Sequence, residues 1–177
     1  FLEGKHIFSF DFDNSSLFYS RRIGHAPSFY PNLNTNEFVK YPDNTAILSA
    51  AKMSGKTAKG FSIGVLESLT ANEHASIDSI GKRKHLNVEP LTNYALIRVQ
   101  QDYNQGNTVL GGIFTSTNRF IQQPQLDFLN RNAYTGGFDL LHQWHEKEYY
   151  IDAKLVGSNI NGSNEAMINL QQSSARY

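Results

Sequence analysis

The sequence predicts an all-β fold of antiparallel up-and-down hairpins that form part of a transmembrane β-barrel. Three observations support this prediction. Apolar and polar residues alternate over long stretches, most clearly from Tyr134 to Leu155, and a period of two is typical of strands with one apolar and one polar face. These stretches are about 10–12 residues long, against a usual strand length of about 5–6. Short turns and long connections also tend to alternate along the chain.

The chain divides into an N-terminal segment and a strand region. Residues 1–42 are a loop-rich segment with at most one strand, at residues 17–23, and residues 43–177 supply six or seven barrel strands. Pro124 interrupts the one stretch that could hold a helical turn. The strands pair around short polar turns at residues 57–60, 104–107 and 145–148. The predicted strands cover residues 45–56, 61–70, 94–103, 108–118, 134–144, 149–158 and 165–172.

The hairpin around the 145–148 turn also predicts a register. If Trp144 pairs with Tyr149, the apolar residues of the two strands face one another, and an acidic residue faces a basic one on the polar side. The pairs expected from this register are Phe138 with Leu155, Leu140 with Ala153, and Asp139 with Lys154.

Strand length and loop length favour a membrane barrel over a soluble protein. A strand that crosses a bilayer at a tilt needs roughly 9–11 residues. Outer-membrane barrels have short turns at one end and long loops at the other, and the connections at residues 72–92 and 119–132 are long, although the turn at residues 161–164 is short. A soluble sandwich or barrel could also contain these hairpins. Because a closed membrane barrel needs at least about eight strands, we expect this chain to be a piece of a larger barrel.

The parity of each residue assigns it to one face of the predicted barrel. One parity carries aliphatic and aromatic residues that would contact lipid, and the other would line a polar lumen. Aromatic residues beside the 145–148 turn are expected at the headgroup level of the membrane. The lipid-facing candidates are Phe138, Leu140, Ile151, Leu155, Ile97 and Val99; the lumen-facing candidates are Asp139, Lys154, Asp152, Arg98, Gln100 and Gln143; the interfacial aromatics are Trp144, Tyr149 and Tyr150.

Composition excludes several classes of function. Lys and Arg together number 16, as do Asp and Glu, and this balance lacks the basic footprint of a nucleic-acid-binding protein. The chain has no Cys, which excludes a disulfide scaffold, a Cys-based zinc site and a Cys nucleophile. It begins with Phe1 and shows no apolar stretch typical of a signal peptide, so we expect a mature, trimmed or fragmentary chain.

The motifs that suggest chemistry each have a simpler structural interpretation. Residues 50–57 match a relaxed P-loop pattern, but residues 60–65 form a predicted strand and leave no room for the phosphate-binding helix. His142 and His145 are three positions apart, a spacing that points side chains to opposite faces of a strand. Asp139 and Asp152 could approach the separation of a glycosidase carboxylate pair, but a ladder of salt bridges is simpler. We therefore expect no nucleotide, metal, cofactor or catalytic residue.

Ordered sequence blocks carry a resemblance to a known family. The blocks are Phe1 to Gly4, Leu17 to Gly24, Ile47 to Lys56, Ser62 to Glu67, Val88 to Tyr94, Gly106 to Thr108 and Thr117 to Arg119. Together they resemble the C-terminal β-barrel domain of unknown function in outer-membrane proteins of Gram-negative bacteria, which carry an N-terminal domain like carbohydrate-binding module family 9. The resemblance covers nearly the whole chain, although His25 stands where we expect Arg. It implies an outer-membrane location, the lipid bilayer as a partner, and further chain before Phe1 and after Tyr177.

The resemblance also implies a function, namely the capture, uptake or handling of glycans at the cell surface, with glycans or other outer-membrane proteins as partners. Because the carbohydrate-binding module lies outside this chain, sugar binding is assigned to no residue. One alternative is a soluble β-sandwich that binds carbohydrate through exposed aromatics, which predicts a second sheet over the apolar faces. Another is a glycoside hydrolase using Asp139 and Asp152, which would be contradicted if cations hold both carboxylates.

Overall fold

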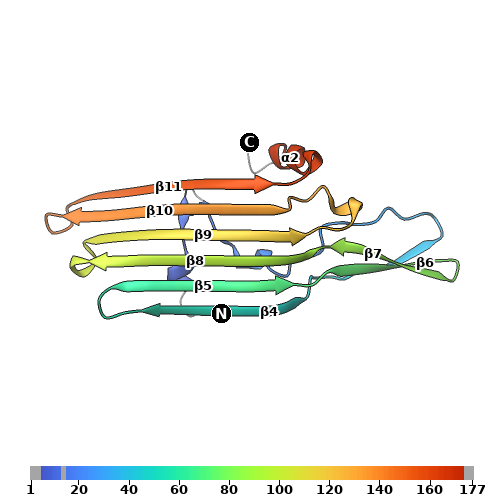
Figure 1. Ribbon diagram of the computed structural model, residues 1–177, viewed down its shortest axis with the longest axis horizontal. Helices are drawn as coiled ribbons and strands as arrows, with labels where there is room; N and C mark the ends of the chain where they lie inside the picture. Colours follow the sequence, from blue (N-terminus) through green and yellow to red (C-terminus); the bar gives the residue numbers. More distant parts are fainter. Residues whose placement is uncertain (1–4, 13–14, 174–177) are drawn as a thin grey trace.

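Six long strands form one antiparallel sheet (Figure 1) in the computed structural model, which describes residues 5–12 and 15–173. The strand order is β11-β10-β9-β8-β5-β4, and every pairing is antiparallel. The predicted all-β class of antiparallel hairpins is therefore confirmed. The strands are β4 (Ile47–Lys56), β5 (Phe61–Thr70), β8 (Leu91–Tyr103), β9 (Thr108–Phe120), β10 (Asn132–Trp144) and β11 (Tyr149–Asn161).

The register predicted for the last hairpin is confirmed. Alternation over long strands fixes it, because a shift by one residue would turn every side chain to the other face. The observed partners of β10 and β11 include Trp144 with Tyr149, Leu140 with Ala153, Phe138 with Leu155 and Asp139 with Lys154.

A second sheet of three strands lies beyond one end of the long strands (Figure 1). Its order is β3-β6-β7, with β3 spanning Glu37–Lys40, β6 Glu73–Ser79 and β7 Lys82–Glu89. The long connection predicted over residues 72–92 therefore contains two strands that the sequence analysis did not predict. Ala75 and Ile77 are fully buried, but they stand among charged residues and make an alternation too short to mark a strand in the sequence.

Within the N-terminal segment, residues 5–12 and 15–23 lie against one face of the six-stranded sheet and are drawn in blue behind it in Figure 1. The predicted strand at residues 17–23 is wrong, because the N–H of Arg22 and of Ile23 donate to the carbonyls of Tyr19 and Ser20 and close a 3₁₀ turn there. The segment, with β3, has three short strands rather than at most one. Its elements are α1 (Lys5–Phe8), β1 (Asp11–Phe12), β2 (Ser15–Ser16) and the turn η1 (Ser20–Arg22).

A helix, α2, replaces the last predicted strand and spans Asn164–Gln171. The Oγ of Ser163 accepts a hydrogen bond from the N–H of Ala166 at 3.0 Å, and Glu165 adds negative charge to the first turn. Both features stabilise a helix N-terminus, and they outweigh the weak alternation of residues 165–172. Across the described residues, no helix is long and apolar enough to cross a membrane. The other short turns are η2 (Asn104–Gly106) and η3 (Pro124–Leu126).

The edges of the six-stranded sheet have no paired neighbour among the described residues. β4 pairs only with β5, and β11 pairs only with β10. The described strands therefore form an open sheet, and they do not close on themselves.

Candidate functional site

The six-stranded sheet has two faces of opposite character, which we call the apolar face and the polar face. On the apolar face, large aliphatic and aromatic side chains are left uncovered: Phe138 is 70% exposed and Leu155 is 71% exposed. The register places the six aliphatic and aromatic candidates from the sequence on this one face. They are Phe138, Leu155, Ile151, Ile97 and Val99, all exposed, and Leu140, which is half-buried.

Aromatic side chains gather towards both ends of the apolar face. At the end with the short hairpin turns, the rings of Trp144 and Tyr149 stack with centroids 6.0 Å apart, and Tyr103 is exposed at the end of β8. Towards the other end, the rings of Phe114 and Tyr134 stack with centroids 6.3 Å apart. The apolar face is thus a band of mostly aliphatic side chains between two groups of aromatic rings.

Tyr150 lies on the polar face, as its strand parity predicts, and therefore opposite to Trp144 and Tyr149. Its register partner is Gln143, which belongs to the polar parity of β10, and consecutive strand residues point to opposite faces. Tyr150 borders a polar groove of about 740 Å³. The groove is lined by Asp11, Phe12, Tyr150, Ile151, Asp152 and Lys154.

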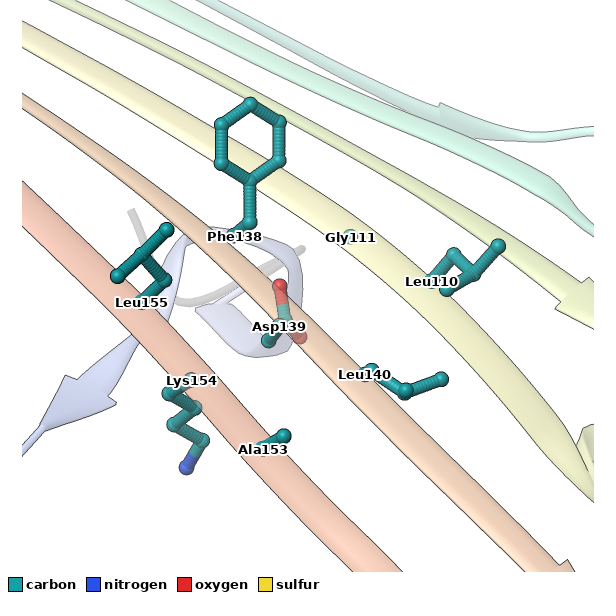
Figure 2. A pocket seen from close by; sticks show the side chains of 8 residues that line it. All are labelled: Leu110, Gly111, Phe138, Asp139, Leu140, Ala153, Lys154 and Leu155. Atoms are coloured by element: carbon teal, nitrogen blue, oxygen red, sulfur yellow. The ribbon is translucent and has the colours of Figure 1, made fainter.

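A shallow hollow of about 440 Å³ lies along β9, β10 and β11 (Figure 2). Leu110, Phe138 and Leu155 border it on the apolar face, and Gly111 and Ala153 leave room between them. The other lining residues are Leu140, Asp139 and Lys154, the last two from the polar parity of the same strands. Its apolar-face walls therefore offer van der Waals contacts.

The polar face contains a buried ion pair between β8 and β10. Both Nη atoms of Arg98 donate to the Asp139 carboxylate, at 2.6 and 2.7 Å, and Arg98 is only 3% exposed. The pair spans β9, where Gly111 lies between the partners: a Cβ on Gly111 would be 2.6 Å from Nη1 of Arg98. Such two-point pairing is strong and directional. Sequence reasoning placed both residues on one face but did not predict this pair, because they are two strands apart.

Aromatic rings of the N-terminal segment cover this polar face. Phe10 is 3% exposed, and the guanidinium carbon of Arg98 lies 5.2 Å from its ring centroid. Phe8 is also buried, and Nζ of Lys52 lies 5.0 Å from its ring centroid. Both distances fall within cation–π range. The buried core of the sheet consists of Phe8, Phe10, Leu66, Leu96 and Ile113.

The remaining lumen-facing candidates lie on the polar face without forming one compact site. Nζ of Lys154 lies 3.9 Å from the Asp152 carboxylate, although the register places Lys154 opposite Asp139. Gln100 and Gln143 are half-buried. Each carboxylate of the proposed glycosidase pair thus has a cationic partner, Arg98 or Lys154, and this arrangement argues against the hydrolase alternative.

The other candidate motifs form ordinary hairpin structure. Residues 50–57 lie in β4 and the turn that follows it, and β5 comes next, where a phosphate-binding P-loop requires a helix. His142 Nδ1 lies 2.9 Å from the Thr108 hydroxyl, and His145 pairs with Glu148 in the exposed turn at 3.5 Å. Within the described ranges, no three His, Asp or Glu side chains gather as a metal-ion site would require.

A buried carboxylate, Glu89, ties the loop after the N-terminal turn to the end of β7. Glu89 is 1% exposed, accepts the N–H of Ser28 at 2.6 Å and lies 3.7 Å from Nε2 of His25. The hydroxyl of Tyr41 lies 2.9 Å from the carbonyl oxygen of Pro27. Burial, and then the charge of Glu89, raise the pKa of Tyr41 above its ordinary value. The sequence analysis did not predict this cluster, because Glu89 is a single acidic residue whose partners Ser28 and His25 lie more than 60 positions away in the sequence.

Fold and site together define a class: an all-β protein whose open antiparallel sheet has one uncovered apolar face and one polar face covered by its own N-terminal segment. The chain belongs to the family described as domain of unknown function DUF5916, whose model matches residues 1–175. It has no significant match among curated proteins or solved structures.

Proposed function

We propose that this chain forms part of the wall of an outer-membrane β-barrel in a Gram-negative bacterium. In this proposal the apolar face contacts lipid and the polar face lines the lumen. The residues towards lipid are Phe138, Leu140, Ile151, Leu155, Ile97 and Val99; those towards the lumen are Asp139, Lys154, Asp152, Arg98, Gln100 and Gln143.

The dimensions of the apolar band carry this proposal. Ten positions separate Trp144 from Tyr134 along β10, a distance of about 33 Å at roughly 3.3 Å per residue. At a strand tilt of about 40° this distance projects to about 25 Å, the height of the apolar band between the aromatic girdles of outer-membrane barrels. In water, a contiguous exposed surface of this kind would promote association.

The unpaired edges of β4 and β11 are consistent with this role. An open edge in lipid would leave backbone N–H and C=O groups without partners. We therefore propose that both edges pair with further strands of the same barrel. The soluble sandwich is the weaker alternative, because no second sheet covers Phe138 or Leu155 among the described residues.

The barrel would serve the capture, uptake or handling of glycans at the cell surface. This part of the proposal is supported by the resemblance to proteins that pair such a domain with a module like carbohydrate-binding family 9. Glycans and other outer-membrane proteins are the proposed partners, and no residue of this chain is assigned to sugar binding. Binding of labelled oligosaccharides to vesicles with and without the full natural protein would test it, and equal binding would contradict it.

The membrane role can be tested with Trp144, the single Trp of this chain, in the full natural protein with any Trp outside this chain replaced by Phe. The protein is refolded into vesicles whose acyl chains carry bromine, a contact quencher, at a known depth. Trp144 fluorescence should be quenched most by bromine near the headgroups, where interfacial Trp is enriched. In a Trp144→Phe background, Phe138→Trp should be quenched most by bromine near the bilayer centre.

Gln143→Trp in the same background is the matched control. Gln143 neighbours Trp144 in sequence but belongs to the polar parity of β10, so its emission should be insensitive to brominated lipid. Equal quenching of Phe138→Trp and Gln143→Trp, or none of either, would contradict the assignment of faces.

A further inference from the structure

We propose that the N-terminal segment is a plug that occupies the barrel lumen and closes it to solutes. The plug segment consists of residues 5–12 and 15–23. This inference rests on the proposed function, because the polar face lines a lumen only if the sheet is part of a closed barrel. A barrel without such a segment would hold water against Arg98, Asp139 and Lys52.

Sockets in the sheet are shaped for the plug segment. A Cβ on Gly64 would lie 2.9 Å from Cε1 of Phe8, and a Cβ on Gly137 would lie 2.9 Å from Cζ of Phe10. Any larger residue at these two positions on β5 and β10 would push the rings away from the sheet. The two glycines are 73 positions apart in sequence, so the fit depends on the folded sheet and on the segment together.

The plug segment also covers the charges of the polar face. Phe10 lies against the guanidinium of Arg98, which is held by Asp139, and Phe8 lies against the ammonium of Lys52. Cation–π contacts of this kind are stronger when water is excluded. Leu17, Phe18 and Ile23 pack against the same core. The contacts therefore extend along the segment and are not confined to one anchor.

The plug segment crosses the sheet at a position where it would obstruct the lumen. Phe8 packs near β5 and Phe10 near β9 and β10, so the segment crosses the central strands of the sheet at mid-length (Figure 1). A chain that lies there would obstruct solutes passing along the strands. Beside it, the polar groove along β11, bordered by Asp11, Phe12 and Tyr150, stays open to solvent.

The test is a conductance measurement on the full-length protein in planar lipid bilayers containing KCl. Phe8→Ala with Phe10→Ala should raise the current per inserted protein above that of the wild type, because a lumen that the plug segment no longer fills can hold water. Phe12→Ala is the matched control, since Phe12 belongs to the same segment but is 41% exposed. Its current should equal that of the wild type.

An engineered disulfide gives a second readout, because it ties the plug segment to β5 covalently and leaves Phe10 and its contact at Gly137 unchanged. Cγ2 of Ile7 lies 3.1 Å from a Cβ on Gly64, so Ile7→Cys with Gly64→Cys brings the two Cβ atoms close to the roughly 3.5–4.5 Å of a disulfide. The chain has no other Cys. The disulfide should form in the bilayer without added catalyst, and the oxidised protein should conduct no more than the wild type.

The outcomes separate this inference from the proposed function. A protein that inserts, shows a heat-sensitive electrophoretic shift, and conducts equally with and without Phe8 and Phe10 would overturn the plug and leave the barrel intact. Failure of the two cysteines to join in an inserted protein would also overturn the plug. A protein that never inserts into lipid would overturn the barrel, and the plug with it.

Discussion

Phe138 and Asp139 are adjacent on β10, yet their environments are the reverse of those in a water-soluble sheet. The aromatic side chain is 70% exposed, whereas the carboxylate side chain is 16% exposed and paired with a buried Arg98. A soluble antiparallel sheet packs its apolar face on a core and leaves its polar face in water. On the side of Asp139, this ion pair and the apolar core that includes Phe10 hold the N-terminal segment against the sheet. On the other side, the described residues leave Phe138 uncovered.

Removal of one partner of the buried ion pair should have the largest effect on stability. Asp139→Ala leaves the Arg98 guanidinium buried beneath Phe10 without its carboxylate, and such a loss typically costs about 3–5 kcal/mol. Urea unfolding followed by Trp144 fluorescence in lipid vesicles would measure it. Asp152→Ala is the control, because Asp152 is half-exposed and 3.9 Å from Lys154. Equal effects of the two variants would contradict the importance of the buried pair.

A charge on the apolar face should have the next largest effect. Phe138→Arg should lower the free energy of unfolding in lipid by about 2–4 kcal/mol, the cost of Arg at the midplane of a membrane barrel. The same substitution at an exposed site of a soluble protein changes stability by about 0.5 kcal/mol or less. A loss of about 0.5 kcal/mol or less for Phe138→Arg would therefore contradict the assignment of the apolar face to lipid. Gln143→Arg, on the polar face, should be nearly neutral.

Gly111 and Gly112 on β9 allow a smaller test of the difference between the two faces, because they belong to opposite parities of the strand. Gly111→Ala places a methyl group against Arg98 and Asp139 and should cost about 1–3 kcal/mol through overpacking. In Gly112→Ala the new methyl group meets Phe138 at 3.6 Å and the carbonyl oxygen of Gly137 at 3.8 Å, and both are ordinary contacts. It should leave unfolding in urea almost unchanged, since nothing has to move. A larger loss for Gly112→Ala than for Gly111→Ala would contradict the packing of the polar face.

The smallest expected effect lies outside both faces, in the three-stranded sheet. A hydrogen bond from the Asn34 N–H at 2.9 Å, and then one from Lys84 at 3.1 Å, hold the pKa of Glu37 below its ordinary value. Because the folded pKa is lowered, Glu37 stabilises the fold above its unfolded pKa of about 4.3. That contribution is lost as the pH falls through the folded pKa.

Lys84→Ala should raise the pKa of Glu37 part of the way to its ordinary value, since the Asn34 hydrogen bond stays. Carboxyl ¹³C NMR titration would measure the change. Arg83→Ala should leave the Glu37 pKa unchanged, because Arg83 lies near Asp78, at 4.0 Å. A Glu37 pKa that is insensitive to Lys84→Ala would show that the backbone hydrogen bond acts alone.

Local alternation was enough to predict the three long hairpins, β4–β5, β8–β9 and β10–β11, but not the contacts between distant strands. The β10–β11 register follows from residues within one hairpin, so Trp144 and Tyr149 could be paired from the sequence alone. The pair of Arg98 and Asp139 depends on a strand between them that has Gly111 at the crossing point. The alternation within β8 or within β10 does not indicate that their side chains meet across β9.

The other differences arise where short local signals compete. Alternation predicted a strand over residues 165–172, but the hydrogen bond from the Ala166 N–H to the Ser163 side chain stabilises a helix there. In β6, only Ala75 and Ile77 are buried, and their neighbours in sequence are polar. Two apolar residues are too few to indicate a strand by alternation. Phe8 and Phe10 are buried because their rings pack over Gly64 and Gly137. These contacts join residues far apart in the sequence, so no local pattern predicts them.

The glycine sockets also imply an order of assembly. Most strands of the sheet pair with a sequence neighbour, and the exception, β5 with β8, is separated by one hairpin. Such low contact order lets hairpins add one after another as the chain emerges. Phe8 and Phe10 precede every strand of this sheet, so in the proposed barrel they can dock on the growing sheet before it closes. After closure of that barrel, two bulky rings would have no wide route to Gly64 and Gly137, and late docking would require two strands to separate.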